Sequence, residues 1–553
     1  MQTSLATTRI LKVAVTGLCG LAFVVGSVRL VSSVPWGNYV AQFWDCSTLI
    51  QGVQNPGFPT GENSEVGQYA VMKYGYALPV WLLYRVFKTD AIPLWGTLWF
   101  LVLLVAPVFT SVFRRDHQFG WTGFLAYAAL LVAMPFTHKY LYMANPTIQS
   151  TALWMLLALF YETGPPDGWL RRLLVVPGLL CGLLVLTDYK WFSFCVVAVL
   201  AIESVTVISA SKHKDRWALP RAAIHVLDRV LLALLWIAIF IAIASLTNQV
   251  YLRSVLGYAA GTKAADAFRL TLSGNFFIFL WILGGFWFLA WLLTDFFFEK
   301  AEKRPLSRPD SAIAVRLLLI AIVIILGFSV VFWPRSARMY APVVALLFCL
   351  GGRQVQSSVA RATHATIWPI LSQSVLIIVL IGVQARAFTS GASFKMPTGV
   401  DQVAKFLTLH RQQMGTAPVG CYAPPIFEVA AGDEMRWTNL AASPPADMDW
   451  VVTSEFFDRL YIGEFDLRRG HAQGWAEAVN KTRLRLLEKS VLAQSFANDF
   501  YRSPAYLCEV AIADRMLLEQ WRRGRLEPAP RWELRFVGGR YGRAIPDGLL
   551  APE

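Results

Sequence analysis

The chain has 553 residues, of which 56% are hydrophobic and only 16% are charged, and its mean hydropathy is +0.48. A soluble domain carries about 25% charged residues, so this composition excludes an ordinary soluble protein. The net charge of +14 arises wholly in residues 1–386, because residues 387–553 hold 20 basic and 20 acidic residues. The surplus falls in short loops between apolar segments, as in membrane proteins, and nucleic-acid binding is therefore not expected.

The first apolar segment extends to about residue 31 and has no small-residue cleavage site. A segment of this length can span a bilayer, so we expect a retained helix rather than a cleaved signal peptide. Ten further apolar segments follow, which predicts about 11 transmembrane helices. The predicted spans are residues 13–31, 94–112, 121–136, 147–161, 173–187, 191–208, 230–246, 276–294, 312–332, 340–350 and 367–385.

Charge between the predicted spans sets their orientation. With a cytoplasmic N-terminus, the six inner segments hold 18 Lys and Arg, and the longer outer loops hold 10, Lys73 among them. This bias follows the positive-inside rule. An odd number of spans then places residues 387–553 outside, which is the periplasm if the host membrane is a bacterial inner membrane. Two outer loops are long, at 33–92 and 247–275, and residues 79–87 predict an interfacial amphipathic helix.

Residues 1–386 are thus predicted to form a transmembrane domain, and residues 387–553 a small soluble extracytoplasmic α/β domain. Apolar periodicity in the second part predicts two helices and three short buried strands. The helices are expected at 400–412 and 475–492, and the strands at 419–422, 450–453 and 532–537. Cys421 and Cys508 are both in this part and could form a disulfide in an oxidising compartment.

Asp45 is the outward acidic residue with the most distinctive surroundings. The other outward acids are Glu62, Glu65, Asp90, Asp188 and Asp266. Asp45 follows Phe43 and Trp44 where the chain returns to the interface after the first span. A carboxylate held against aromatic rings is partly desolvated, which suits a general base. The alternative is an interfacial aspartate exposed to water.

Basic residues gather in three short outward turns. Two arginines three residues apart can grip a phosphate, and the other turns place lysine among aromatic residues. The residues concerned are Arg335 and Arg338, Tyr189 and Lys190, and His138 and Lys139. Each could instead anchor a helix end at the interface, but three such turns on the side of Asp45 favour a site for an anionic headgroup.

A family resemblance rests on several of these segments. Asp45 after the first span, followed by the run Tyr74-Gly75-Tyr76 with Pro79 and an apolar helix, resembles the GT-C class of polytopic membrane glycosyltransferases. Looser matches are Asn145-Pro146, Leu186-Thr187-Asp188-Tyr189-Lys190 and Arg338-Met339-Tyr340-Ala341-Pro342. The likeness is to the aminoarabinose, mannosyl and arabinosyl transferase group, whose members use a polyprenyl-phosphate-linked sugar.

The resemblance implies an inverting displacement at the anomeric carbon, with an extracytoplasmic glycan, lipid or protein as acceptor. Asp45 would act as the base. Arg338 and Lys190 would bind the lipid phosphate, with Arg335, Lys139, His138 and Tyr189 beside them, and Glu62, Glu65, Tyr74 and Tyr76 would contact sugar or acceptor. Some members use a divalent cation (Mg²⁺ or Mn²⁺). Many members carry Asp-Glu where this chain has Asp45-Cys46, and one acid alone disfavours a tight metal site.

Three other readings of the sequence stay open. A transporter or flippase of a lipid-linked saccharide would use the same headgroup site, but paired broken helices in two halves are not evident. Another envelope transferase, such as an O-antigen ligase or an acyltransferase, is the second. The third is a structural subunit of a cell-envelope complex. Glu203, an acid inside the sixth predicted span, is a functional candidate by its position, or it satisfies a neighbouring helix.

Overall fold

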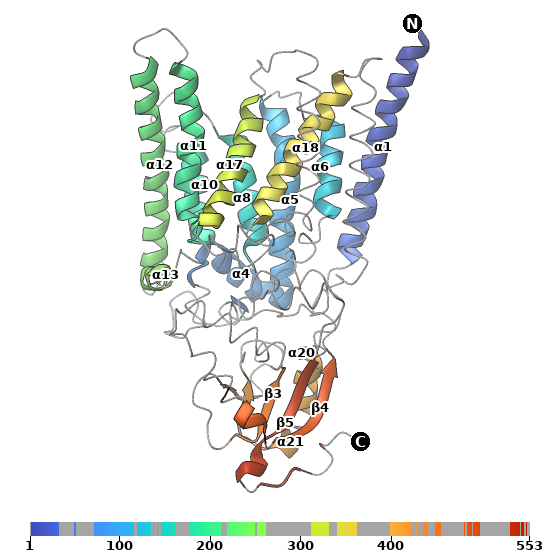
Figure 1. Ribbon diagram of the computed structural model, residues 1–553, viewed down its shortest axis with the longest axis vertical. Helices are drawn as coiled ribbons and strands as arrows, with labels where there is room; N and C mark the ends of the chain where they lie inside the picture. The colour runs from blue at the N-terminus through green and yellow to red at the C-terminus, as the bar shows by residue number, and fades with distance from the viewer. Residues whose placement is uncertain are drawn as a thin grey trace.

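A computed structural model (Figure 1) describes a helical bundle and a smaller sheet-containing part. The described residues, with a few single positions besides, are 2–32, 71–114, 119–133, 145–161, 176–211, 218–248, 251–260, 311–330, 340–361, 399–421, 435–440, 448–454, 484–488, 490–497, 531–541 and 543–546. The predicted spans at 276–294 and 367–385 lie outside these residues.

The bundle is built from long apolar helices. They are α1 (Gln2–Ser32), α5 (Ala91–Arg114), α6 (Trp121–Ala133), α8 (Thr147–Phe160), α10 (Val176–Thr187), α11 (Trp191–Ser211), α12 (Ala218–Thr247), α17 (Ser311–Val330) and α18 (Ala341–Arg361). Among the described residues, segments of α1, α5 and α12 are long and apolar enough to cross a membrane, and the others contain shorter apolar stretches. Each overlaps a predicted span, because an uninterrupted apolar run has few alternatives to a helix in lipid. The helix α12 begins before its predicted span at 230–246, and α18 continues beyond its predicted span at 340–350.

Two helices form the centre of the bundle. In α8 the side chains from Thr147 to Leu159 are buried with the exception of Leu156, and α18 is buried from Ala341 to Arg353. A helix that is apolar all round is buried by its neighbours. By contrast, α1 exposes Val13, Leu21 and Val28, as expected for a helix that faces lipid.

Glycines let α6 and α18 cross closely. A Cβ on Gly123 would lie 2.6 Å from the carbonyl oxygen of Gly352, and a Cβ on Gly352 would lie 2.5 Å from that of Gly123. Without a hydrophobic driving force between helices in lipid, such small-residue contacts allow the backbones to pack. The crossing holds the central α18 against α6.

Shorter helices lie at one end of the bundle. The helix α4 (Tyr74–Phe87) is followed by the turn η1 (Lys88–Asp90), and α13 (Tyr251–Ala260) follows α12. Figure 1 shows α4 and α13 at the end of the bundle opposite the N-terminus. On α4 the guanidinium of Arg85 lies 4.8 Å from the ring centroid of Trp81, a pairing that suits a helix lying at an interface.

The remaining elements form a mixed sheet flanked by α20 (Val400–Leu409), α21 (Arg411–Met414) and the turn η6 (Gly538–Tyr541). The strands are β1 (Val419–Cys421), β2 (Trp437–Asn439), β3 (Trp450–Thr453), β4 (Val491–Ala497) and β5 (Arg531–Phe536), in the order β2-β1-β3-β5-β4. The pairs of β1 with β2 and with β3 are parallel, and β5 pairs antiparallel with β3 and β4. The sheet lies beyond the end of the bundle that carries α4 (Figure 1).

This part has its own hydrophobic core, in which Trp450 packs on Phe536 and Phe427 lies between Trp437 and Trp532. Cys421 is buried on β1. Cys508 lies outside the described residues, so the disulfide stays a prediction.

Candidate functional site

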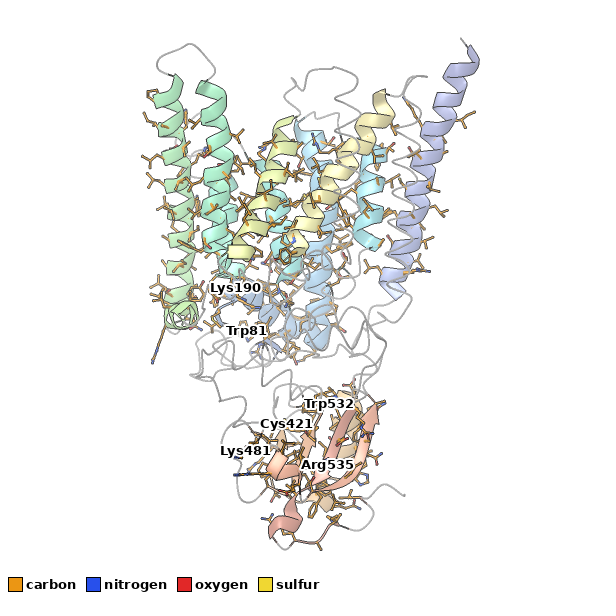
Figure 2. The ribbon with its side chains drawn as sticks, viewed as in Figure 1. Trp81, Lys190, Cys421, Lys481, Trp532 and Arg535 are labelled. Atoms are coloured by element: carbon orange, nitrogen blue, oxygen red, sulfur yellow. The ribbon has the colours of Figure 1, made fainter. Side chains whose placement is uncertain are left out.

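A pocket opens where the ends of five helices come together, near the end of the bundle that faces the sheet. Figure 2 shows Lys190 and Trp81 at this end. The space between its walls is about 320 Å³, a value that includes solvent at the open side. Its lining residues come from the start of α4, the start of α8, the turn between α10 and α11, and the start of α18: Lys73, Asn145, Pro146, Thr147, Ser150, Asp188, Trp191 and Pro342.

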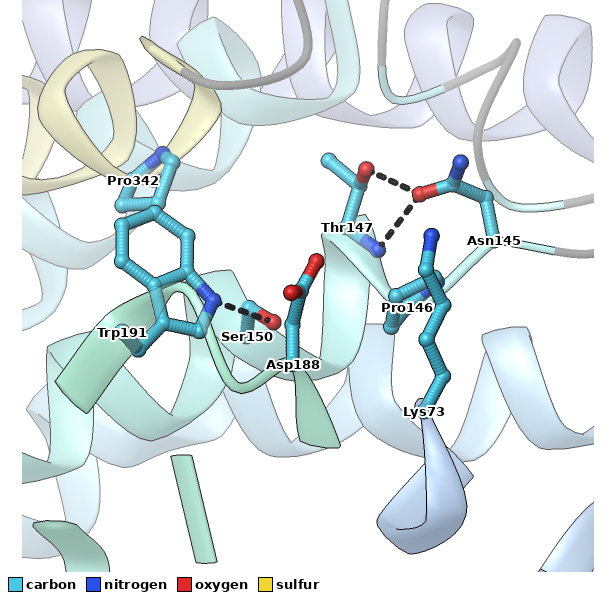
Figure 3. Close-up of a pocket in the computed structure, with 8 residues that line it drawn as sticks. All are labelled: Lys73, Asn145, Pro146, Thr147, Ser150, Asp188, Trp191 and Pro342. Carbon is cyan, nitrogen blue, oxygen red and sulfur yellow. Dashed lines mark hydrogen bonds between the residues drawn. The ribbon is translucent and has the colours of Figure 1, made fainter. Parts of the chain in front are cut away.

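Lys73 and Asp188 bring opposite charges to this pocket. Their exposed fractions are 4% and 7%, so both are largely removed from solvent. Lys73 directly precedes α4, and its carbonyl oxygen accepts the N–H groups of Tyr76 and Ala77 at 2.9 and 2.8 Å. The start of the helix therefore fixes the position from which the Lys73 side chain enters the pocket (Figure 3).

The Asp188 side chain is held by the turn that it occupies. Its Oδ1 accepts the backbone N–H of Lys190 at 3.2 Å, and its carbonyl accepts the N–H of Trp191 at 3.0 Å. This is the local hydrogen bonding by which aspartate favours turns and helix starts. Trp191 in turn donates from Nε1 to Ser150 Oγ at 3.1 Å, which ties the turn to α8 (Figure 3).

The first turn of α8 forms another wall. Asn145 Oδ1 accepts the N–H of Thr147 at 3.0 Å and also its hydroxyl, so Asn145, which precedes the N-cap Pro146, satisfies the first N–H group of the helix. The positive end of the helix dipole lies at this N-terminus. Together with the Lys73 ammonium it gives the pocket a side suited to an anion such as phosphate.

Tyr251, the first residue of α13, lies close to this pocket without lining it. Its ring packs edge-on against Tyr74, with centroids 6.3 Å apart. Burial and the nearby carboxylate of Asp188 raise the pKa of Tyr251 to about 12.

Most of the residues that the sequence singles out lie outside the described part of the chain. These are Asp45, Glu62, Glu65, His138, Lys139, Arg335 and Arg338. Four others are described but do not line the pocket. Tyr74 and Tyr76 are buried in α4, Tyr189 packs against the bundle core, and Lys190 contributes its backbone N–H to Asp188.

Sequence reasoning missed Lys73, Ser150 and Trp191 as site residues. Lys73 entered only as one of ten outward basic residues, and the signal that could have singled it out is its place immediately before Tyr74-Gly75. Asp188 and Asn145 were noticed in loose motifs without a role. These residues come to line one pocket through the packing of α4, α8 and α10, which cannot be predicted from any single segment of the sequence.

The donor set of the pocket does not fit a divalent cation. It offers one carboxylate and several neutral oxygens next to an ammonium, whereas Mg²⁺ and Mn²⁺ favour sites with carboxylate ligands and water. No group of three His, Cys, Asp or Glu side chains arranged to hold a metal occurs among the described residues.

No protein-family model matches the chain, and no curated protein matches its sequence. Solved structures do match in fold. The structure of ArnT from Cupriavidus metallidurans bound to undecaprenyl phosphate matches at a TM-score of 0.50 and 12% identity, over 97% of this chain and 100% of that one.

Two structures of an archaeal oligosaccharyltransferase from Archaeoglobus fulgidus also match, each at 11% identity and over 88% of that chain. The apo form has a TM-score of 0.52 over 95% of this chain. AglB in complex with an inhibitory peptide and a dolichol-phosphate has a TM-score of 0.51 over 94% of this chain. The chain therefore has the fold of these membrane transferases, which confirms the GT-C fold expected from the sequence.

Proposed function

We propose that the chain is a membrane glycosyltransferase that moves a sugar from a polyprenyl-phosphate carrier to an extracytoplasmic glycan, lipid or protein. The observation that carries the proposal is a pocket at the N-terminus of α8 that both Lys73 and Asp188 line. The fold supports it, since similar structures hold undecaprenyl phosphate and dolichol-phosphate. The proposed setting is a bacterial inner membrane, with the pocket on the periplasmic side.

The reaction is an inverting displacement. The acceptor oxygen forms a bond to the anomeric carbon, the bond from that carbon to the phosphate oxygen breaks, and the polyprenyl phosphate leaves with the electron pair. The proton of the acceptor hydroxyl passes to a carboxylate, for which Asp45 remains the assignment. Because phosphate is already a good leaving group, the main demand on the protein is to stabilise its charge where water is excluded.

Lys73 meets this demand in the proposal. Its largely buried ammonium and the N-terminal end of α8 line the same pocket, so a phosphate there gains charge-assisted hydrogen bonds and a favourable dipole. Asp188 is assigned to sugar hydroxyls, because its fixed carboxylate is an acceptor at the same pocket. The phosphate role predicted for Lys190 is retained as a rival to Lys73 and is tested beside it.

The test is sugar transfer by the purified protein from a panel of radiolabelled polyprenyl-phosphate sugars. We expect release of polyprenyl phosphate with transfer. Lys73→Met should lower kcat/KM by about two orders of magnitude, as for loss of a group that stabilises developing charge. Asp45→Asn should lower it by about two orders, as for loss of a general base.

Controls use the same substitution elsewhere. Lys405→Met changes an exposed lysine on α20 and should leave transfer unchanged, while Lys190→Met distinguishes the rival phosphate assignment. If Lys73→Met transfers as well as wild type, the pocket is not the phosphate site. If the protein moves a lipid-linked saccharide across the membrane of vesicles and transfers no sugar, the hypothesis of a transporter or flippase is supported instead.

A further inference from the structure

Gln149 joins the segment that carries Lys73 to the segment that carries Asp188. Its Nε2 donates to the carbonyl oxygen of Gly75 at 3.1 Å and to the hydroxyl of Thr187 at 3.0 Å. Gly75 follows Lys73 by two positions, and Thr187 directly precedes Asp188. One side chain of α8 therefore bridges the two segments whose charged residues, Lys73 and Asp188, line the pocket.

The carbonyl of Gly75 needs this donor because of Pro79. Proline has no N–H, so the carbonyl four residues before it in a helix loses its intrahelical partner. In α4 that carbonyl belongs to Gly75, and the amide of Gln149 donates to it. Since an unsatisfied buried carbonyl costs free energy, the proline makes the start of α4 depend on a residue of α8.

The orientation of the Gln149 amide is also set. Trp95 Nε1 donates to Gln149 Oε1 at 3.0 Å, so the oxygen faces α5 and both N–H bonds are left for Gly75 and Thr187. Gln149 is only 5% exposed, and water has little access to compete for these bonds. The network fixes which end of the amide donates.

The two bridged segments are in direct backbone contact. A Cβ on Gly75 would lie 3.0 Å from the carbonyl carbon of Leu186 and 3.0 Å from the nitrogen of Thr187. Glycine at this position thus lets the start of α4 touch the end of α10. The spacing between the segments is therefore set by two features, a close contact and a hydrogen-bonded bridge.

We propose that Gln149 is a positioning residue, which through Gly75 and Thr187 sets the separation between Lys73 and Asp188. The proposal rests on the proposed function, in which Lys73 holds the phosphate and Asp188 the sugar of one donor. Displacement of reacting groups by about 1 Å costs up to about 100-fold in rate. Loss of the bridge should therefore act on kcat more than on donor KM.

The first variants remove the bridge. Gln149→Leu removes all three hydrogen bonds, and Gln149→Glu keeps an acceptor for Trp95 but has no N–H for Gly75. We expect each to lower kcat about 10- to 100-fold, with donor KM within about threefold of wild type. Thr187→Val should act in the same direction, while Thr187→Ser, which keeps the hydroxyl, should restore near wild-type kcat.

A matched control and a second perturbation separate positioning from general damage. Thr110→Val removes a buried bond to the Ala106 carbonyl within α5, of 2.8 Å, and should leave kcat per folded molecule unchanged. Gly75→Ala should push the same two segments apart while the Gln149 side chain itself is unchanged. We expect it to lower kcat as Gln149→Leu does. Melting temperature is recorded for every variant, so that only folded protein is compared.

Binding of undecaprenyl phosphate, followed by tryptophan fluorescence, makes the outcomes distinguishable. We expect Gln149→Leu to bind it about as tightly as wild type, since Lys73 itself remains. If wild type is active and Gln149→Leu keeps its kcat, or if Thr187→Ser loses as much as Thr187→Val, Gln149 does not act as proposed. If wild type binds the lipid but transfers no sugar, the proposed function fails, and with it the assignment of the bridge to catalysis.

Discussion

Glu203 has a satisfied place in the bundle that is separate from the pocket. The hydroxyl of Tyr161 donates to its Oε1 at 2.7 Å, and the guanidinium of Arg316 donates to the Tyr161 carbonyl. Glu203 is 1% exposed, and it lies twelve residues after Trp191 in α11, or about 18 Å along the helix. This favours a stabilising role that joins α8, α11 and α17 over a role in transfer.

Tyr161→Phe tests that role. The substitution keeps the ring but leaves the buried carboxylate without this donor, at a cost of about 1–3 kcal/mol. We expect a lower melting temperature in detergent and unchanged donor KM. Tyr251→Phe is the matched control, because the buried hydroxyl of Tyr251 finds no hydrogen-bond partner among the described residues. Its removal should leave the melting temperature unchanged or raise it. Equal losses in the two variants would contradict the importance of the Tyr161 hydrogen bond.

At the scale of single residues, the sequence singled out Asp188 and Asn145 within short motifs but could not predict which groups line one pocket. Lys73, Asn145 and Asp188 lie in three segments far apart in the sequence, separated by 72 and 43 positions. Their convergence depends on the contact of Gly75 with the end of α10 and on the bridge through Gln149. Neither feature has a periodic pattern, so only the packed helices reveal it.

At the scale of elements, apolar runs predicted the bundle helices well, and the strand Trp450–Thr453 coincides with β3. The helix predicted at 475–492 was wrong at its end. Val491 begins β4, where residues pair with β5 and a register shift lies between Leu492 and Gln494. Apolar residues there suit either a helix face or a strand, and pairing with β5, far along the chain, decides between them. The short strand β2 was missed, since three residues give no period.

The crossing of α6 and α18 gives a test at the same scale. Gly352→Ala places a methyl group against the Gly123 carbonyl oxygen at 2.5 Å and the Tyr127 Cβ at 3.0 Å. The helices must separate, and overpacking of this kind costs about 1–3 kcal/mol. We expect a clear fall in melting temperature, measured by size-exclusion chromatography of heated samples in detergent.

Gly17→Ala provides the control for that experiment. Gly17 also lies within a long helix, but a Cβ there would have no atom of the described residues within 4 Å. Alanine has the higher helix propensity, so the melting temperature should stay the same or rise. A fall of similar size in both variants would mean that the crossing of α6 and α18 is not under close steric constraint.

At the scale of the whole molecule, the described residues form two separate hydrophobic cores. The bundle core holds the pocket between helix ends, and the second core lies under the five-stranded sheet. The sheet and the helix α4 lie toward the same end of the bundle, while the N-terminus of α1 lies at the other (Figure 1). The charge bias of the loops predicts that the end with the N-terminus faces the cytoplasm and that the end with the pocket faces outward.

The orientation can be tested by cysteine labelling. In a background without the seven native cysteines, Leu409→Cys introduces a thiol at a position that is 81% exposed on α20. A membrane-impermeant maleimide should label it in intact spheroplasts, because we expect α20 to face the periplasm. A cysteine in an N-terminal tag should react only after the membrane is permeabilised. The reverse pattern would invert the topology, and Lys73 and Asp188 would then face the cytoplasm, where an extracytoplasmic acceptor cannot reach them.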